Sequence, residues 1–303
     1  MRIRGSRTAI ALGVGAALLG GGIAAGPAAS AAQSAAAHAP PTAQRLVPVE
    51  GTANFRDLGG YRTYDGEKTR SGVLYRSEAL NKVTPNGVAQ MAALKLKGIV
   101  DFRTAAEIAA NGPDKYPAGV PNTNLAVSDG GLMTTLYAVI TSGDPVKQEQ
   151  ILGNGRAAQL MVDMYRTFVD DPAIRAQFAA TAKGVANGTV SLYHCSAGKD
   201  RAGWMTAILL TAVGVPTGTV NQDYLLSNQY LKPGNDALKQ QLLASGRMQN
   251  PSLLDPLLGV DQRYLDAARA AIDARYGSFG KYLTDGLGLD ILTLVKLRQR
   301  LVT

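Results

Sequence analysis

Residues 194–204, His-Cys-Ser-Ala-Gly-Lys-Asp-Arg-Ala-Gly-Trp, place a thiol and a guanidinium around one short loop. The loop follows a run of β-forming residues, Thr189–Tyr193, and opens an apolar helix that stops near Gly214 and Pro216. The first N–H groups of such a helix have no partner within it, and the helix dipole adds positive charge, so the loop can hold an oxyanion. The sequence therefore predicts a phosphate-binding site that contains a nucleophile.

Cys195 is the candidate nucleophile and Arg201 the candidate phosphate ligand. A cysteine at a helix N-terminus beside a cation can have its pKa lowered from about 8.5 to roughly 3.5–7.5, which makes it a thiolate at neutral pH. Arg201 can return to the loop and bind two phosphoryl oxygens in a bidentate fork. Because substrate must reach the sulfur, we expect the Cys195 side chain to be open to solvent.

This segment resembles the phosphate loop of the cysteine-dependent protein-tyrosine phosphatases, in which five residues separate the cysteine from the arginine. Here the two are Cys195 and Arg201, and His194 precedes the cysteine. Other segments are similar to the secreted bacterial branch of that family, of the mycobacterial type, and the similarity runs from about Val49 to the C-terminus. These segments are Asn54–Tyr61, Asp101–Thr104 and the Asp200 inside the loop. The resemblance implies an α/β fold with a central parallel β-sheet flanked by helices, and a helical lid-like insertion after the phosphate loop.

The resemblance also implies a two-step mechanism in which the Cys195 thiolate attacks phosphorus and water later hydrolyses the phosphocysteine. No metal or other cofactor is required. The leaving oxygen needs a proton. Asp200 is the favoured acid, Asp101 is second and Asp57 third, and the alternative for the last two is that they accept structural hydrogen bonds. The residues expected to bind substrate phosphate are Ser196, Ala197, Gly198, Lys199, Asp200, Arg201 and Arg103.

Four residues have two interpretations each. His194 is expected to hold the loop through the backbone, the alternative being a base. In similar phosphatases, a lysine at the position of Lys199 is found in enzymes that accept phosphoinositides as well as phosphotyrosine. The alternative is an ordinary exposed lysine. Arg103, like Arg56, lines the pocket or bridges structural carboxylates, and the sequence does not separate these roles.

Ala202 departs from the family pattern, in which Ser or Thr follows the loop arginine and its hydroxyl stabilises the departing thiolate. A lost hydrogen bond to a charged group is worth about 1.5–3 kcal/mol, and about 1.4 kcal/mol in a barrier is a tenfold change in rate. We therefore expect breakdown of the phosphoenzyme to be slowed by roughly ten- to hundredfold, unless Ser196 supplies the hydroxyl.

Two other functions fit a thiolate in an anion-binding loop. One is a phosphate-recognising binding protein whose chemistry is weakened at Ala202. The other is a rhodanese-like sulfurtransferase, but the loop of those enzymes has four residues between cysteine and arginine, and this chain has five.

The N-terminus reads as a secretory signal peptide over residues 1–31. Arg2, Arg4 and Arg7 precede an uncharged stretch from Thr8 to Ala25, and Ala29-Ser30-Ala31 supplies a small-x-small cleavage pattern. The alternative is a membrane anchor that is never cleaved. Residues 32–45 read as a flexible lead-in and residues 46–303 as a single phosphatase domain. The expected location is therefore the cell envelope or the medium.

Composition limits the partners of the mature chain. The formal charge of +8 falls to +5 without the first 31 residues, and the basic residues are scattered without a dense tract. This suits phosphorylated protein or phosphoinositide substrates and does not favour nucleic acid. The single cysteine allows no internal disulfide, and no later run has transmembrane length.

Strands and helices are expected to alternate before the loop, which predicts a parallel sheet whose ligand loops lie at the carboxyl ends of its strands. Strands are predicted at 73–76, 98–102 and 189–193. Helices are predicted at 85–96, from the Thr104–Glu107 capping box onward, at 156–170, 172–183 and 260–276, and from a Thr219 cap. Residues 231–264 are either a helical lid over the active site or a core-packing helical pair.

Overall fold

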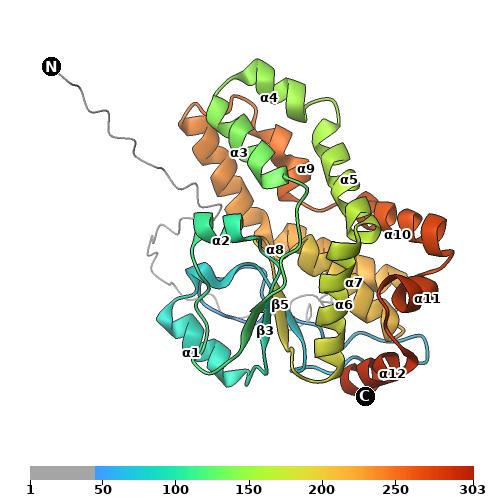
Figure 1. Cartoon of the computed structure of the whole chain (residues 1–303). Helices are drawn as coiled ribbons and strands as arrows, with labels where there is room; N and C mark the ends of the chain where they lie inside the picture. Colours follow the sequence, from blue (N-terminus) through green and yellow to red (C-terminus); the bar gives the residue numbers. More distant parts are fainter. Residues whose placement is uncertain (1–44) are drawn as a thin grey trace, which may run out of the picture.

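The computed structural model describes residues 45–303. Five short strands and many helices follow one another in this part of the chain (Figure 1). The strands are β1 (Arg56–Asp57), β2 (Tyr75–Ser77), β3 (Ile99–Asp101), β4 (Asn122–Asn124) and β5 (Leu192–His194). The α-helices are α1 (Pro85–Ala93), α2 (Ala105–Asn111), α3 (Leu132–Ser142), α4 (Pro145–Leu152), α5 (Arg156–Asp170), α6 (Pro172–Ala186), α7 (Arg201–Ala212), α8 (Thr217–Ala244), α9 (Asp255–Leu258), α10 (Gln262–Tyr276), α11 (Phe279–Lys281) and α12 (Ile291–Leu301), with short turns η1 (Leu80–Lys82), η2 (Pro251–Leu254) and η3 (Tyr282–Gly286).

The strands form one sheet in the order β1-β2-β5-β3-β4. The pairs β2–β5, β5–β3 and β3–β4 are parallel, while β1 pairs with β2 in the antiparallel sense. The predicted α/β class with a parallel central sheet is confirmed, with one antiparallel edge strand that the sequence did not reveal. The register places Ser77 and Asp101 beside His194 on either side of β5, so the three strands end together at the edge that carries the phosphate loop.

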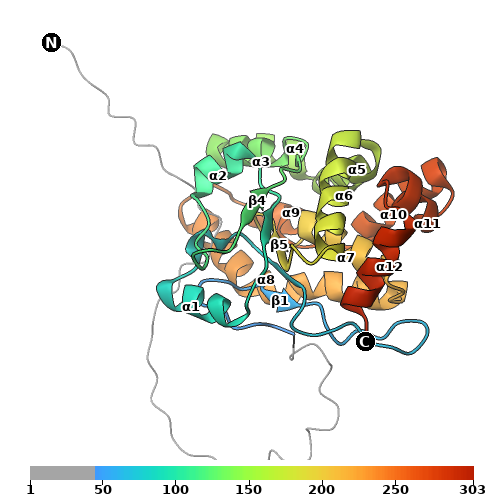
Figure 2. The ribbon, with the colours of Figure 1, turned by 60° about the horizontal axis from the view of Figure 1, so that its bottom comes forward.

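Alternating side chains of the central strands pack into two apolar clusters. Ile99 and Leu192 belong to the cluster that includes Met91 of α1. Val100 and Tyr193, the next residue in each strand, belong to the larger cluster that includes α6 and α7. Successive side chains of a strand point to opposite faces, so the sheet is covered on both sides, by α1 on one and by α6, α7 and α12 on the other (Figures 1 and 2).

Local signals set most of the predicted helix starts. Thr84 accepts a hydrogen bond from the N–H of Gly87 and Pro85 begins α1, and Thr104 and Glu107 form the complete capping box of α2. Helix α5 has its predicted bounds, whereas α6 runs on to Ala186. The predicted cap of α8 is wrong, because the helix begins at Thr217, before Thr219.

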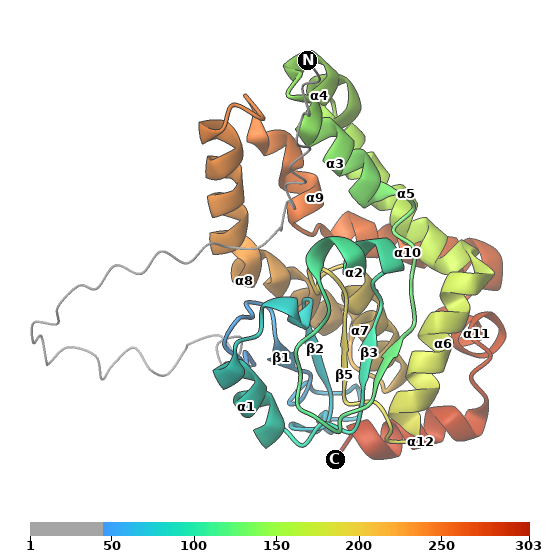
Figure 3. The ribbon, with the colours of Figure 1, turned by 60° about the vertical axis from the view of Figure 1, so that its left-hand side comes forward.

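Helices α3, α4 and α5 stand beside the distal half of α8 and α9 above the carboxyl edge of the sheet (Figure 3). The Gln148 side chain of α4 donates to the carbonyl of Arg247 at 2.7 Å. Leu242, Met248 and Leu254 of the 231–264 segment are buried in the larger cluster. This segment is therefore packed into the body of the protein in the described conformation. Between residues 45 and 303 no helix combines the length and apolarity that crossing a bilayer needs.

Candidate active site

The loop from Cys195 to Asp200 joins β5 to α7 at the carboxyl edge of the sheet. The carbonyl groups of residues 196–199 all accept hydrogen bonds from neighbouring segments. The carbonyl of Ser196 accepts from the N–H of Ala79 at 3.2 Å, and that of Ala197 accepts from the Asn54 side chain at 3.1 Å. The carbonyls of Gly198 and Lys199 accept from Arg76 at 2.7 and 3.2 Å.

In a trans peptide the N–H points away from the carbonyl of the same unit. Each N–H of residues 197–200 is therefore directed away from the bound carbonyl of its own peptide unit. An oxyanion cradle is built from N–H groups that are left free in this way.

Gly198 makes this loop shape possible. Its φ is +68°, and a Cβ built on it would lie 2.4 Å from the backbone carbonyl carbon of Ser77 and from the backbone nitrogen of Glu78. The left-handed conformation and the contact with the end of β2 both exclude a side chain. A glycine is therefore required at this position for packing against β2 as well as for the turn.

Glu107 holds the guanidinium of Arg201 in a bidentate pair. Nη1 and Nη2 of Arg201 donate to the two carboxylate oxygens at 2.7 and 2.5 Å, and both side chains are almost fully buried. Ser196 Oγ donates to the same carboxylate at 2.5 Å. Burial alone would raise the pKa of Glu107, but Arg201 and Ser196 lower it to about 2. The guanidinium of Arg201 is therefore held at the loop by the negative charge of Glu107.

Burial lowers the pKa of Arg201, but the hydrogen bonds to Glu107 and the neighbouring Cys195 raise it well above its ordinary value. Cys195 is only 2% exposed. The expectation of a side chain open to solvent is therefore wrong for the described conformation, because the loop and its neighbours enclose the sulfur. Ser196 and Ala197 on the loop keep partial exposure.

Asp200 occupies the N-cap position of α7, but its side chain makes no capping hydrogen bond. Instead Oδ1 accepts from the Tyr165 hydroxyl at 3.1 Å, and Oδ2 accepts from Lys199 Nζ at 2.8 Å. The Tyr165 hydroxyl also lies 2.7 Å from that of Tyr224. The carboxylate is thus positioned beside the loop by side chains and is 15% exposed.

Lys199 does not present a free cation. Its Nζ donates to Asp200 and, at 3.0 Å, to the carbonyl of Gly259, and the residue is 4% exposed. Gly259 belongs to the 231–264 segment, so Lys199 ties that segment directly to the phosphate loop.

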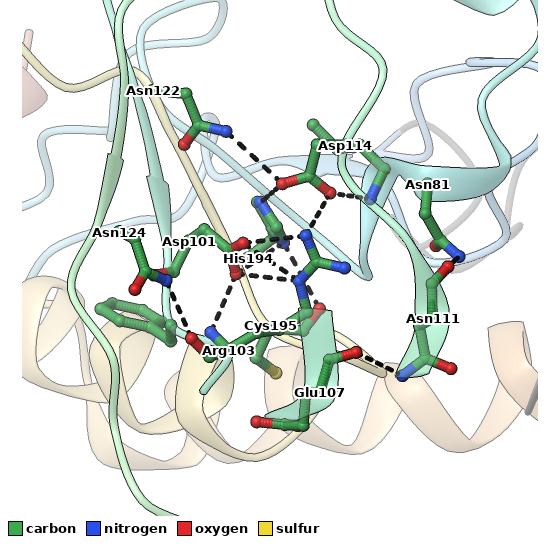
Figure 4. Close-up of polar contacts among 12 residues, drawn as sticks. Asn81, Asp101, Arg103, Glu107, Asn111, Asp114, Asn122, Asn124, His194 and Cys195 are labelled. Carbon is green, nitrogen blue, oxygen red and sulfur yellow. Dashed lines mark hydrogen bonds and ion pairs between the residues drawn. The ribbon is translucent and has the colours of Figure 1, made fainter. Parts of the chain in front are cut away.

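Asp101, Arg103, Asp114 and His194 form a buried network behind the loop (Figure 4). Asp101 accepts from the backbone N–H and from Nε and Nη2 of Arg103, at 2.8–3.1 Å. Asp114 lies 2.8 Å from Arg103 Nη2 and 3.1 Å from His194 Nε2. Although burial opposes ionisation, His194 and Arg103 lower the pKa of Asp114 to about 2. Arg103 therefore bridges structural carboxylates, the second of its two readings.

The oxygens and ring nitrogens of Asp101, Asp114 and His194 lie within 4.8 Å of one another, close enough for metal ligation. The guanidinium of Arg103 contacts both carboxylates at 2.8 Å. A metal ion would have to share the carboxylates with this fixed positive charge, so the donor set does not fit one.

A second buried network supports the loop from the side of α8. Asp223 pairs with Arg56 at 3.0 Å and with Arg76 at 2.8 Å, and it accepts from the Tyr61 hydroxyl at 2.7 Å. All three charged side chains are fully buried. Burial opposes ionisation of Asp223, but the two arginines lower its pKa far below its ordinary range. Arg56 therefore has the bridging role, and it positions Arg76 against the loop carbonyls through Asp223.

Asp57 lies away from these groups on the edge strand β1. Its carboxylate accepts from the N–H groups of Gly59 at 2.8 Å and Gly72 at 2.6 Å. This is the hydrogen-bonding alternative stated for it, and it places the side chain outside the cluster around Cys195.

Sequence reasoning did not find Glu107, Asp114 or Asp223 as site residues. The capping box already accounted for a glutamate at position 107, so its second role was not expected. Glu107 does complete that capping box, since its Oε2 accepts from the Thr104 N–H at 2.8 Å. Asp114 and Asp223 follow no pattern that separates them from surface acids. The only signal for them was that Arg56, Arg76 and Arg103 lie near predicted strands, where buried cations need partners.

Comparison with known proteins agrees with this geometry. The sequence profile described as the tyrosine phosphatase family matches residues 47–303. The chain belongs to the tyrosine phosphatase family. A Cupriavidus necator protein whose name assigns it provisionally to the tyrosine-protein phosphatases is 33% identical over 250 residues, which cover 80% of this chain and 84% of the relative.

The triple specificity protein phosphatase PtpB of Mycobacterium tuberculosis is 31% identical over 270 residues, covering 82% of this chain and 96% of the relative. A tyrosine-protein phosphatase of Nostoc commune is 32% identical over 114 residues, covering 36% of this chain and 38% of the relative. The tyrosine phosphatase family membership makes this chain a phosphoric monoester hydrolase and sets the sulfurtransferase reading aside.

Proposed function

We propose that this phosphatase hydrolyses phosphotyrosine through a phosphocysteine intermediate at Cys195. One observation carries the proposal: the thiol and the Arg201 guanidinium share a loop whose N–H groups point away from its bound carbonyls. A phosphoryl group in this cradle accepts hydrogen bonds from the N–H groups while Arg201 binds two of its oxygens. Its phosphorus then lies in front of the sulfur.

In the first step the thiolate forms a bond to phosphorus, and the bond between phosphorus and the ester oxygen breaks. The leaving oxygen takes a proton from a carboxylic acid. In the second step water attacks phosphorus, the phosphorus–sulfur bond breaks, and the water proton returns to the carboxylate. No atom outside the chain, the ester and water enters this balance.

Asp200 is the proposed acid. Two aspects support it: its side chain is held beside the loop by Tyr165 and Lys199, and it retains partial exposure. Asp101 is less suited, since Arg103 occupies both of its oxygens. Asp57 is bound to backbone N–H groups on another strand.

We further propose that the 231–264 segment moves when substrate enters. The support is that Cys195 is enclosed and that Lys199 is bound to Gly259 of this segment. A phosphorylated ligand at the loop competes with that carbonyl for Lys199. In this proposal Lys199 becomes available to a second phosphate, as in a phosphoinositide, only after the segment has moved.

Export is proposed from the sequence alone. Residues 1–31, which read as the signal peptide, and residues 32–44 of the lead-in lie outside the described residues. N-terminal sequencing of the protein recovered from the culture medium and from the envelope tests this. A mature start near Ala32 supports export with cleavage, and a retained Met1 in the membrane fraction supports the uncleaved anchor.

The substrate class is tested by kcat/KM on a phosphotyrosine peptide, a phosphoserine peptide and a phosphoinositide. The variants are Lys199→Ala, Asp200→Asn and, as a control, Lys147→Ala at an exposed position of α4. We expect Asp200→Asn to lower kcat on the phosphotyrosine peptide by roughly a hundredfold or more, because general acids contribute about 10²–10⁴. A loss in Lys199→Ala confined to the lipid supports dual specificity, which is in keeping with the name of the Mycobacterium tuberculosis relative.

An unchanged rate in Asp200→Asn would assign the acid to another residue. The competing function, a phosphate-binding protein with weakened catalysis, predicts no turnover of p-nitrophenyl phosphate by the wild type. Turnover that disappears in Cys195→Ser, while phosphate affinity persists, excludes that function.

A further inference from the structure

An open cavity of about 460 Å³ lies at the end of the sheet opposite to the phosphate loop. Val73, Lys97 and Ser191 on its wall precede β2, β3 and β5, so the cavity is at the amino ends of the three parallel strands. The phosphate loop follows the carboxyl end of β5. Helix α12 forms another wall and lies at this end of the molecule in Figure 1. The cavity is therefore separate from the site that contains Cys195.

The side chains that line the cavity are strongly cationic. No Asp or Glu is among them, although neutral polar and apolar residues are. The five basic residues on its wall are Arg70, Lys95, Lys97, Lys296 and Arg300. Like charges gathered around one cavity repel one another, so a bound anion would relieve a cost that the protein otherwise bears.

The partners of these cations within residues 45–303 are neutral. Arg70 Nε donates to the carbonyl of Val302 at 2.8 Å, and Lys296 Nζ lies 3.4 Å from the amide oxygen of Asn187. None of the five makes an ion pair with a carboxylate of the described chain. Asp290, at the start of α12, is influenced by the charge of Lys296 but does not pair with it.

Arg300 is the most confined of the five. Its Nε is buried and has no hydrogen-bond partner among the described residues. The guanidinium lies over Gly188, where an added Cβ would come within 2.7 Å of Nη1. A buried donor without an acceptor costs free energy, and Arg300 lines the cavity with this hydrogen-bonding capacity unused.

We propose that this cavity binds a small anion that carries two or more phosphate or sulfate groups. Its volume is within the range of small-ligand sites. Arg300 and the lysines would bind the anionic groups through charge-assisted hydrogen bonds. The hydroxyl of Ser191, which accepts from the N–H of Lys97 at 3.1 Å, has its own hydrogen to donate. Val73 and Leu94 offer apolar contact to the remainder of the ligand.

The same chemistry is found in soluble polyphosphates and in the headgroups of anionic lipids. The exposed side chains of Leu292 and Val295, 61% and 44% exposed, precede Lys296 on α12. Leu292 is four residues before Lys296 and therefore lies on the same side of the helix. These apolar side chains could contact lipid beside the cavity, so binding to vesicles is tested as well as binding to a soluble polyphosphate.

The test is calorimetric titration with tripolyphosphate of the protein from residue 32, with vanadate occupying the catalytic loop. We expect one binding event that weakens by about a hundredfold or more in Lys97→Ala/Arg300→Gln, since this variant removes two charged contacts that are each worth about a tenfold change or more. The matched control, Lys147→Ala/Arg166→Gln, removes the same charge from exposed positions of α4 and α5. Lys95→Ala/Lys296→Ala provides a second cavity variant with only surface changes. Turnover of p-nitrophenyl phosphate should be equal in all of them.

Co-sedimentation with vesicles of phosphatidylcholine, with and without phosphatidylglycerol, distinguishes the sources. Tripolyphosphate binding without vesicle binding indicates a soluble ligand. Vesicle binding that needs the anionic lipid and is lost in both cavity variants indicates a headgroup. The proposal is overturned if neither probe binds the wild type, or if the cavity variants and the matched control lose affinity equally.

Discussion

Glu107 is predicted to be the residue on which the position of Arg201 depends. The informative change is Glu107→Gln, because glutamine keeps the length of the side chain and the capping of α2 but removes the charge. The carboxylate of Glu107 accepts two hydrogen bonds from Arg201 and one from Ser196. In the variant the buried guanidinium of Arg201 is left without its anionic partner.

The magnitude follows from the pKa of Glu107, which is lowered from its ordinary value of 4.5 to about 2. Each pKa unit corresponds to about 1.4 kcal/mol, so ionised Glu107 stabilises the folded protein by about 3 kcal/mol in order of magnitude. Glu107 is almost fully buried, so solvent screening does not greatly reduce this. We expect Glu107→Gln to lower Tm at pH 7 by roughly 6–12 °C.

The pH dependence has a definite sign. The folded-state pKa is lower than the unfolded one, so the stabilisation is fully present above pH 4.5 and is lost as the pH falls toward 2. The difference in the free energy of unfolding between wild type and Glu107→Gln should therefore shrink from pH 5 to pH 3.

The assay is urea unfolding of both proteins at pH 7, 5, 4 and 3, with kcat/KM measured at pH 7. We expect kcat/KM to fall by roughly tenfold or more, because the fork no longer has a fixed orientation. Glu149→Gln, at an exposed position of α4, is the matched control. Equal stability of Glu107→Gln and wild type at pH 7, or a difference that does not change with pH, would refute the reasoning.

Three further changes test other parts of the site. Gly198→Ala should reduce kcat at least a hundredfold and lower Tm, because its Cβ would lie 2.4 Å from the end of β2; near-normal turnover would show that the loop tolerates displacement. In Ala202→Thr the added hydroxyl should speed breakdown of the phosphoenzyme by roughly ten- to hundredfold, so rapid-quench kinetics should show a larger burst in the wild type; equal hydrolysis rates would disprove this. Asp114→Asn should lower the free energy of unfolding at pH 7 by about 2 kcal/mol, because His194 and Arg103 lower the pKa of Asp114 to about 2. This loss should disappear as the pH falls toward 2, where the wild-type carboxylate is protonated. A pH-independent effect would contradict the prediction.

The Ser196 alternative for the missing hydroxyl at Ala202 is weakened by the structure. Ser196 Oγ donates its hydrogen to Glu107 at 2.5 Å, so that hydrogen is already used in holding Arg201. Ala202 itself is fully buried in the larger apolar cluster. A threonine there must fit its extra atoms into that packing, so Tm should be measured together with the burst.

The sequence predicted what local pattern determines. The strand before Cys195, the helix after it and the capping box at Thr104 each depend on neighbouring residues, and β5, α7 and α2 lie where those patterns put them. The alternation of strands and helices predicted that β2, β5 and β3 run parallel, although it did not predict their order in the sheet. The ends of β2, β3 and β5 lie one to three residues from their predicted positions, because hydrogen bonding between strands decides where pairing begins.

Contacts between distant segments could not be predicted in this way. Asp223 meets Arg56 and Arg76 across about 150 residues of sequence, and nothing near Asp223 indicates those partners. Glu107 pairs with Arg201, 94 residues further along the chain, and its role in the capping box gave no sign of this second contact. The burial of Cys195 likewise depends on tertiary packing around the loop and not on the motif.

The central claim is that Cys195 forms a covalent bond to phosphorus while Arg201 holds the phosphoryl oxygens. Rapid acid quench of the wild type with a radiolabelled phosphotyrosine peptide, followed by peptide mapping, measures this directly. We predict a stoichiometric burst of label on the peptide that contains Cys195, absent in Cys195→Ser and strongly reduced in Arg201→Ala. Full turnover without label on that peptide, or turnover that persists in Cys195→Ser, would contradict the account.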